Sequence, residues 1–203
     1  MSSLNIFSYN VNGINDDDKR DDVIRHLYTL RADIQILIDT RLKDKDENRI
    51  RNQADTFNYS CVFQNRKDQN SSRGILILIS KNKDIDYETL FKSDDGNFIL
   101  LKVKYDNRKI LIAATYGPNK DNPNFYLRNL RKIENCNLEE TILCGDFNIV
   151  NNHNIDQIGY NNERNRRAKY ILNGYIDTKQ LFDPVDHFEL ERPHCTWFKP
   201  DGT

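Results

Sequence analysis

The sequence lacks the features that mark membrane proteins, zinc-bound domains and disulfide-rich domains. No apolar stretch approaches the length needed to span a bilayer, and Met1 is followed by polar Ser2 and Ser3, which leaves no room for a signal peptide. The four cysteines show no C-x-x-C spacing, which argues against a zinc site or a disulfide framework. We therefore expect reduced thiols in an intracellular protein, either cytosolic or nuclear.

Net charge is nearly absent as well. The chain has 30 lysines and arginines against 31 acidic residues, a formal charge of -1. The molecule as a whole is therefore not a polycation drawn to nucleic acid, and any polyanionic partner must be held by a local patch. The sequence shows no internal repeat and no linker, so its 203 residues are expected to form a single domain over residues 1–203.

Short apolar runs separated by turn residues predict an α/β protein. A strand at residues 4–9, an amphipathic helix at 23–30 and a buried strand at 34–38 predict a β-α-β opening. The remaining expected strands lie at residues 59–63, 74–79, 98–103, 110–116 and 141–144, and the remaining expected helices lie at residues 125–133 and 163–175. The charged segment 43–52 is compatible with a helix and is interpreted as a solvated surface turn and not as a binding site. The pattern favours two packed sheets with helices outside.

Polar residues follow several of these runs where each strand ends. Asp39 comes directly after residues 34–38, and Asp146 follows the run that ends in Gly145. A carboxylate can accept a proton from water or hold a divalent cation, and an amide can donate to a phosphate oxygen without adding negative charge. If the extended geometry persists, Asp146 and Asn148 project to one side of the chain. A plain Asp/Asn turn after a strand is the competing interpretation.

Six short motifs occur in the order and approximate spacing of a known family. They are Ser8-Tyr9-Asn10-Val11-Asn12-Gly13, Asp39-Thr40-Arg41-Leu42, Arg73-Gly74-Ile75, Ala114-Thr115-Tyr116-Gly117-Pro118-Asn119, Gly145-Asp146-Phe147-Asn148 and Thr196-Trp197-Phe198. The chain resembles the endonuclease/exonuclease/phosphatase superfamily. More narrowly, it resembles the apurinic-like endonuclease domain of non-LTR (LINE-type) retrotransposons. The resemblance covers essentially the whole chain.

The resemblance implies a fold, an activity and a cofactor. The implied fold is a DNase-I-like, four-layer α/β sandwich in which two packed mixed β-sheets are flanked by helices. The implied activity is Mg²⁺-dependent hydrolysis of a phosphodiester, with Mn²⁺ as an alternative ion. Such an endonuclease nicks DNA and leaves a 3′-hydroxyl that primes reverse transcription of a retroelement. The implied partners are DNA and a reverse transcriptase fused in the full-length protein.

The resemblance also assigns catalytic roles by position. Tyr116 matches the tyrosine that contacts the phosphate, Asp146 the residue that orients or deprotonates the attacking water, and Asn148 the amide that steadies the transition-state phosphate. A phosphodiester anion resists attack by hydroxide, so this chemistry needs a cation to spread charge and an acceptor for the water proton.

Metal and phosphate positions carry over in the same way. Asp39 stands where the family has a Glu that ligates Mg²⁺, and Asn10 matches the family's first Asn, beside the metal and the phosphate. The remaining positions implied for phosphate or DNA binding are Asn12, Asn119 and Thr196.

The chain departs from the family pattern in three respects. Asp39 is one methylene shorter than the usual Glu, and Ile38 and Arg41 replace the polar residue and the His that commonly flank it. The family also continues after Thr-Trp-Phe with a Ser-Asp-His that provides a catalytic Asp and His, whereas this chain ends at Thr203. None of the chain's own histidines replaces that His; they are His26, His153, His187 and His194. We therefore expect a C-terminally truncated domain.

Two other functions stay open at this point. The first is a phosphatase or phosphodiesterase of the same superfamily that acts on inositol phosphates, lipid head groups or RNA tails. The second is a catalytically impaired copy that only binds nucleic acid. The basic residues between Arg164 and Lys169 could follow a DNA backbone, but a solvated helix face is the favoured interpretation.

Overall fold

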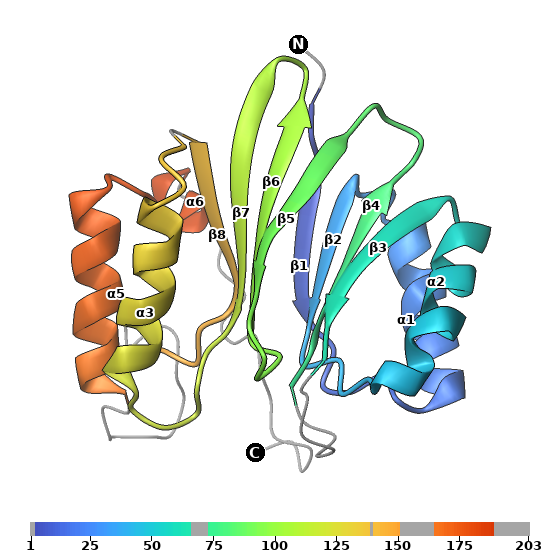
Figure 1. Ribbon diagram of the computed structural model, residues 1–203, viewed down its shortest axis with the longest axis horizontal. Coiled ribbons are helices and arrows are strands. Elements are labelled where there is room, and N and C mark those ends of the chain that lie inside the picture. Colours follow the sequence, from blue (N-terminus) through green and yellow to red (C-terminus); the bar gives the residue numbers. More distant parts are fainter. Residues whose placement is uncertain (1–2, 66–72, 139, 151–164, 189–203) are drawn as a thin grey trace. The chain divides into compact units, whose positions relative to one another are not determined.

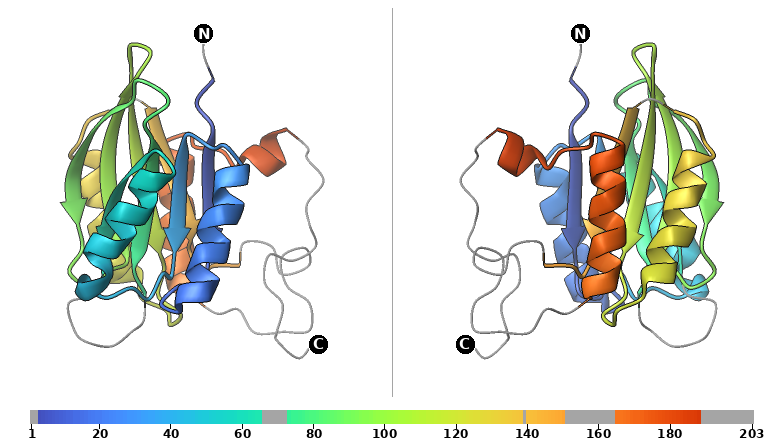
Figure 2. Two further views of the ribbon diagram at one scale, coloured as in Figure 1. Left: turned by 90° about the vertical axis from the view of Figure 1, so that its right-hand side faces the viewer. Right: turned by 90° about the vertical axis from the view of Figure 1, so that its left-hand side faces the viewer.

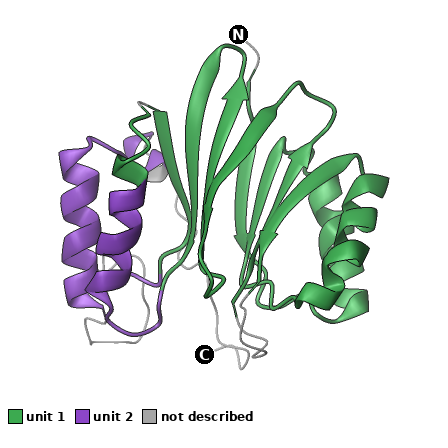
Figure 3. Cartoon of the chain, in the orientation of Figure 1, with its two compact units in different colours: residues 1–117, 133–147 green, residues 118–132, 148–203 purple. Residues whose placement is uncertain are grey.

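The computed structural model describes residues 3–65, 73–138, 140–150 and 165–188 (Figure 1). The chain divides into two compact units (Figure 3). Unit 1 comprises residues 1–117 and 133–147, and unit 2 comprises residues 118–132 and 148–203. The single domain expected over residues 1–203 stays a prediction.

The first sheet of unit 1 has four strands in the order β1-β2-β4-β3. Strands β1 (Ile6–Asn10) and β2 (Ile34–Ile38) run parallel and are joined by helix α1 (Asp17–Thr29), which is the predicted β-α-β opening. Strand β4 (Ile75–Ser80) lies antiparallel to both β2 and β3 (Tyr59–Gln64). Every residue of β2 and β4 is buried, as expected for central strands that are covered on both faces.

Helices α1 and α2 (Glu47–Thr56) lie side by side over the outer face of this sheet (Figure 2). A short 3-10 helix at Asp44–Asp46 precedes α2. The sequence of residues 43–52 was compatible with a helix, as observed, but the interpretation of this segment as a surface turn was wrong. Ile50 and Ala54, four residues apart on one face of α2, are buried against the sheet, while the charged side chains of the helix face solvent.

The second sheet of unit 1 has the order β5-β6-β7-β8. Its strands are β5 (Asp86–Lys92), β6 (Phe98–Tyr105), β7 (Arg108–Tyr116) and β8 (Glu140–Asp146). The β5, β6 and β7 pairings are antiparallel, and β7 and β8 run parallel. Both sheets are therefore mixed, each with one parallel pair.

The second sheet contains one tight hairpin turn, and it contains one strand beyond those expected. Asp106 and Asn107 form the turn of the β6–β7 hairpin with φ angles of 49° and 64°, as a type I′ turn requires. Strand β5 escaped the sequence analysis because it is an edge strand whose residues are exposed or half-buried, so it carries no continuous apolar run.

A shared apolar core holds the two sheets face to face. Alternate residues of the first sheet, such as Ile36 and Ile77, pack with Leu101 and Ile112 of the second, and all four are fully enclosed. Burying a side chain of this size stabilises a fold by about 1.5–3 kcal/mol. The strand ends of the two sheets in unit 1 are thereby fixed with respect to one another.

Unit 2 is helical in its described part. It contains most of α3 (Pro123–Glu134) together with α5 (Arg166–Thr178) and α6 (Pro184–His187). Asp121 accepts a hydrogen bond from the Ala168 backbone N–H at 2.9 Å, which satisfies one of the free donors in the first turn of α5. None of the described helices is long and apolar enough to cross a membrane. Two mixed sheets with flanking helices confirm the predicted α/β class.

Candidate active site

Two neighbouring strand ends in each sheet deliver the predicted polar residues of unit 1. Asn10 is the last residue of β1 and pairs in register with Ile38, so Asp39 follows directly beside it. Tyr116 and Asp146 are the last residues of the parallel strands β7 and β8 and pair with each other. Carboxyl ends of parallel strands share one edge of a sheet, which is the usual location of ligand sites in α/β folds.

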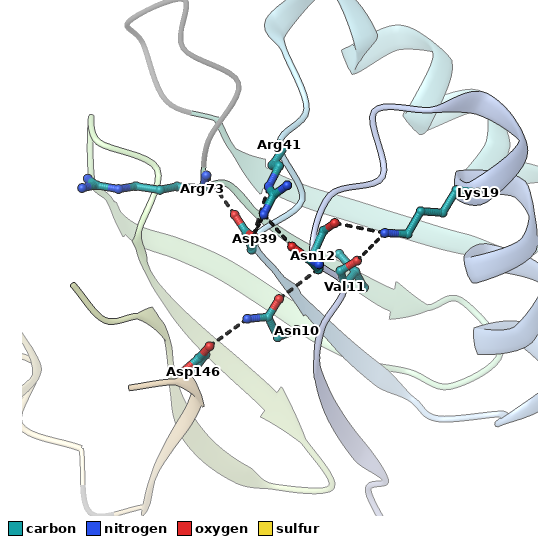
Figure 4. Close-up of polar contacts among 8 residues, drawn as sticks. All are labelled: Asn10, Val11, Asn12, Lys19, Asp39, Arg41, Arg73 and Asp146. Carbon is teal, nitrogen blue, oxygen red and sulfur yellow. Dashed lines mark hydrogen bonds and ion pairs between the residues drawn. The ribbon is translucent and has the colours of Figure 1, made fainter. Parts of the chain in front are cut away.

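A chain of hydrogen bonds links these strand ends across the two sheets (Figure 4). The Asn10 side-chain amide donates to Asp146 Oδ2 at 2.7 Å, and Asn10 Oδ1 accepts from the Asn12 backbone N–H at 3.0 Å. The Asn12 side-chain oxygen in turn accepts from Arg41 Nη2 at 2.6 Å. Asn10, Asn12 and Asp146 are thus brought together as the sequence analysis expected, and Arg41 joins them.

Asp39 lies at the far end of this series of hydrogen bonds and is only 3% exposed. Its Oδ2 accepts from Arg41 Nε at 3.1 Å and from Arg41 Nη2 at 2.7 Å, and its Oδ1 accepts from the Arg73 backbone N–H at 3.0 Å. The hydrogen bond to Asp39 raises the pKa of the Arg41 guanidinium. A buried carboxylate requires such partners, since an unpaired charge in the interior is costly.

Tyr116 is half-buried beside both carboxylates. Burial is the main cause that raises the pKa of its phenol to about 12, and the negative charges of Asp39 and Asp146 act in the same direction. Arg41 and Arg73 oppose the shift. The phenol therefore stays protonated at neutral pH and can donate a hydrogen bond to an anion.

The backbone around these side chains adopts unusual conformations. Four non-glycine residues have positive φ angles: Asn12 at 47°, Asp39 at 57°, Arg41 at 55° and Arg73 at 71°. Such angles are unfavourable for residues with a Cβ atom and persist only where the surroundings impose them, which is common at functional sites. The cluster of strained residues therefore marks this edge of unit 1 as a candidate site.

Glycine permits the close backbone approach on which this edge depends. Gly74 has a φ of 102°, and its backbone carbonyl accepts a hydrogen bond from the Thr40 N–H at 3.1 Å. A Cβ atom at Gly74 would lie 2.5 Å from Thr40 Oγ1. A side chain at this position would therefore separate the segment that carries Asp39 and Arg41 from the segment that carries Arg73.

Two predicted residues, Asn119 and Asn148, belong to unit 2. Strand β8 ends at Asp146 and Asn148 has a φ of 50°, so the extended geometry does not persist and gives no reason for Asp146 and Asn148 to share one side. Asn165, which the sequence analysis missed, donates to the Asn148 carbonyl at 2.6 Å and to the Pro118 carbonyl at 3.4 Å. Within unit 2, this buried amide holds the segments that carry Asn119 and Asn148.

The remaining predicted residue, Thr196, lies outside the described residues, as do His153 and His194. Three further residues of unit 1 support the site and were not predicted as site residues. Arg41 and Arg73 stood within the quoted motifs, which was the available signal. Lys19 donates to the Val11 and Asn12 carbonyls, both at 3.0 Å, and so holds the loop after β1 (Figure 4). Its place in α1 gave no such signal.

The residues around Asp39 do not fit the predicted Mg²⁺. This ion requires several oxygen ligands in near-octahedral geometry. Both oxygens of Asp39 already accept hydrogen bonds, and the positive Arg41 guanidinium lies against Oδ2, where it would repel a divalent cation. The described residues also contain no cluster of three or more His, Cys, Asp or Glu side chains that could hold a metal. The described residues therefore do not support a catalytic step on a metal ion at Asp39.

The chain shows a family relationship over nearly its whole length. A family model described as "Endonuclease/Exonuclease/phosphatase family" matches residues 7–200. The match includes all five residues predicted for catalysis and metal binding.

Several solved structures share the fold at low sequence identity. The endonuclease domain of TRAS1, a telomere-specific non-LTR retrotransposon, has a TM-score of 0.62 and 11% identity over 87% of this chain and 72% of that one. The 3′ phosphatase NExo from Neisseria, bound to a product DNA hairpin, has a TM-score of 0.63 and 15% identity over 86% of this chain and 71% of that one. ANGEL2, a 2′,3′-cyclic phosphatase, has a TM-score of 0.53 and 18% identity over 73% of this chain. The chain spans 54% of the ANGEL2 chain.

Proposed function

The chain belongs to the endonuclease/exonuclease/phosphatase family, a family of phosphoester hydrolases, and on that premise we propose that it hydrolyses phosphodiester bonds in DNA. The observation that carries the proposal is the hydrogen-bonded chain from Asp146 through Asn10, Asn12 and Arg41 to Asp39, with Tyr116 beside it. It combines a proton acceptor, a fixed cation and a phenol donor at one edge of unit 1.

In the proposed reaction, water attacks the phosphorus and Asp146 accepts the proton of the water. The P–O bond to the leaving sugar oxygen breaks, and that oxygen takes a proton from solvent. Asn10 holds Asp146 Oδ2 through its amide at 2.7 Å and so fixes the orientation of the carboxylate. The phenol of Tyr116, which is protonated at neutral pH, donates to a phosphate oxygen. The guanidinium of Arg41 offsets the negative charge that develops on the phosphate. Asn148 has the amide donor that the family resemblance assigns to the transition state.

The finer proposal is that the chain nicks one DNA strand to prime reverse transcription of a retroelement. The likeness to the TRAS1 endonuclease domain and the six motifs in order support it. This role would place the protein in the nucleus at its site of action, with a reverse transcriptase in the full-length protein as its partner. The requirement for Mg²⁺ or Mn²⁺ stays a prediction of the resemblance.

A phosphatase or phosphodiesterase activity on smaller esters is the second candidate. ANGEL2 and NExo, which share the fold, are described as a 2′,3′-cyclic phosphatase and a 3′ phosphatase. The same phosphate-binding groups would serve both reactions, so the geometry alone favours neither substrate. Binding of nucleic acid without hydrolysis is the third possibility.

Nicking of supercoiled plasmid tests the proposal. We expect the unmodified chain to convert supercoiled DNA to the relaxed form, and Asp146→Asn to slow this conversion by about 10²–10⁴-fold, the usual contribution of a general base. Asp86→Asn is the matched control, because it makes the same charge change at an exposed carboxylate that pairs with Lys104. The variant should nick at the rate of the unmodified chain.

The same assay separates the other candidates. Parallel reactions in Mg²⁺ and in EDTA show whether the reaction needs a divalent ion. Hydrolysis of p-nitrophenyl phosphate without nicking would favour the phosphatase, and DNA binding without any hydrolysis would favour the third possibility. Equal nicking by Asp146→Asn and the unmodified chain would refute the assigned role of Asp146.

A further inference from the structure

The carboxylate of Asp39 has a cation partner supplied by the chain itself. Two N–H groups of Arg41 donate to Asp39 Oδ2, at 3.1 Å from Nε and 2.7 Å from Nη2, while the Arg73 backbone donates to Oδ1. The charges of Asp39 and Arg41 cancel within this pair. A divalent ion at Asp39 would therefore have to displace a guanidinium that is already in place.

Two further contacts fix the position of Arg41. Its Nη2 also donates to Asn12 Oδ1 at 2.6 Å, and its backbone N–H donates to the Arg73 carbonyl at 2.6 Å. Arg41 and Asp39 both adopt the left-handed backbone conformation, with φ angles of 55° and 57°, and are separated only by Thr40. The cost of these conformations is offset by the contacts that they allow. The guanidinium is thus held in one orientation.

One end of the guanidinium stays available to a ligand. Arg41 Nη1 makes no hydrogen bond to any part of the chain that the structure describes, and the Arg41 side chain is 38% exposed. A guanidinium presents its N–H groups in a planar fork that matches the oxygens of a phosphate. Arg41 can therefore bind Asp39 and Asn12 on one side and an anion on the other.

We propose that Arg41 is the cation of this site: Asp39 is a positioning residue for Arg41 and not a metal ligand, and Arg41 binds a phosphodiester oxygen directly. The inference rests on the proposed function for the identity of the ligand, but not for the competition between Arg41 and divalent ions at Asp39. It predicts that divalent ions bind weakly at Asp39 and that removal of Arg41 opens the position to them.

Titration with Mn²⁺, followed by the electron paramagnetic resonance of the free ion, tests the first part. Arg41→Gln should bind Mn²⁺ about tenfold more tightly than the unmodified chain, a difference of about 1.4 kcal/mol. Adding Asp39→Asn should remove the gain. Arg49→Gln is the control, because it removes the same charge from an exposed ion pair with Asp17. Equal affinity in the unmodified chain, or a gain that survives Asp39→Asn, would overturn the proposal.

Fluorescence anisotropy of a labelled single-stranded oligodeoxynucleotide in EDTA tests the second part. Arg41→Gln should weaken binding about tenfold, which is about 1.4 kcal/mol, and Arg41→Lys should not restore it, because an ammonium lacks the fork. An equal loss of oligonucleotide affinity in Arg49→Gln would show that only the overall charge matters, and it would overturn the role of Arg41. If the Mn²⁺ and oligonucleotide results are as expected but the chain does not nick DNA, the proposed function is refuted and the proposal about Arg41 is not.

The unmodified chain provides a readout that does not depend on how well the variants fold. Mn²⁺ broadens nuclear magnetic resonance signals of nearby protons. We expect the Arg41 Nε–H signal to be broadened no more than that of Arg49, because divalent ions bind only weakly at Asp39. Selective broadening of the Arg41 signal would place the ion beside Asp39 and contradict the proposal.

Discussion

The two aspartates that follow strand ends in unit 1 have different partners, although they look alike in the sequence. Asp39 is bound by a charged guanidinium and by a backbone N–H, whereas Asp146 Oδ2 is held by the neutral amide of Asn10. The guanidinium already occupies Asp39 Oδ2, so the Asp39 carboxylate orients Arg41. We therefore assign the positioning role to Asp39 and the proton-accepting role to Asp146.

Tyr116 gives a prediction at the same scale. Its pKa of about 12 lies above the ordinary value of 10.0, so between these two pH values the unfolded phenol has lost its proton while the folded one keeps it. The contribution of this residue to stability is complete below about pH 10 and is lost as the pH rises through about 12. The ultraviolet difference titration between the unmodified chain and Tyr116→Phe should show a step near pH 12.

The control for this titration is Tyr170→Phe, which removes a phenol that is 78% exposed. Ionisation of Tyr116 at the ordinary tyrosine value would show that neither burial nor the two carboxylates act on it in solution. In that case the proton on Tyr116 at neutral pH would be that of any ordinary tyrosine. It would not by itself support the proposed hydrogen bond from Tyr116 to the phosphate.

At the scale of elements, the end of β8 depends on Gly145. The φ of Gly145 is 124°, and a Cβ atom there would lie 2.0 Å from the Thr115 carbonyl oxygen of β7. Gly145→Ala should lower the free energy of unfolding by at least about 1–3 kcal/mol through backbone strain, and the clash adds to this. Because Asp146 is the next residue, nicking should fall as well. Urea denaturation and the plasmid assay measure the two effects.

Gly174→Ala is the matched control for this substitution. Gly174 lies within α5, and a Cβ atom there meets no atom within 4 Å. Alanine is favoured over glycine inside helices by about 1 kcal/mol, so this variant should be unchanged or slightly more stable. A loss of stability in Gly174→Ala as large as that in Gly145→Ala would contradict the explanation from the β7–β8 contact.

At the scale of the molecule, the apolar core between the sheets fixes the strand ends that form the candidate site. Ile77 is fully buried in this core. Ile77→Ala should reduce the free energy of unfolding by about 2–5 kcal/mol, and Ile77→Val by about 0.5–1.5 kcal/mol, because the cavity grows with each carbon removed. Leu90→Ala, at a position in β5 that is 37% exposed, should change it by less than about 0.5 kcal/mol. Urea denaturation checks the order, and an equal loss in Leu90→Ala would contradict it.

The sequence predicted much of the fold because the signals for it are local. The strand predicted at residues 34–38 has those bounds in the structure, and its continuous apolar run correctly indicated burial on both faces. Strand β5 was missed, and the helix-compatible segment of α2 was interpreted as a surface turn. The residues of both elements are mostly charged or polar, and only the neighbouring sheet or strand decides what they form. Apolar periodicity predicts a helix or strand well only where one face of that element is clearly apolar.

The sequence by itself determined the α/β class, the order of the strands along the chain and the residue types at their ends, because apolar periodicity and turn chemistry act over a few residues. Only the tertiary structure decided which of these residues meet. Asn10 and Asp146 are separated by 136 residues, and their hydrogen bond exists because the core between the sheets aligns two strand ends. Likewise, the hydrogen bonds from the Arg41 guanidinium to Asp39 depend on the left-handed backbone conformation of these two residues and on the backbone N–H of Arg73. No local pattern in the sequence encodes that arrangement.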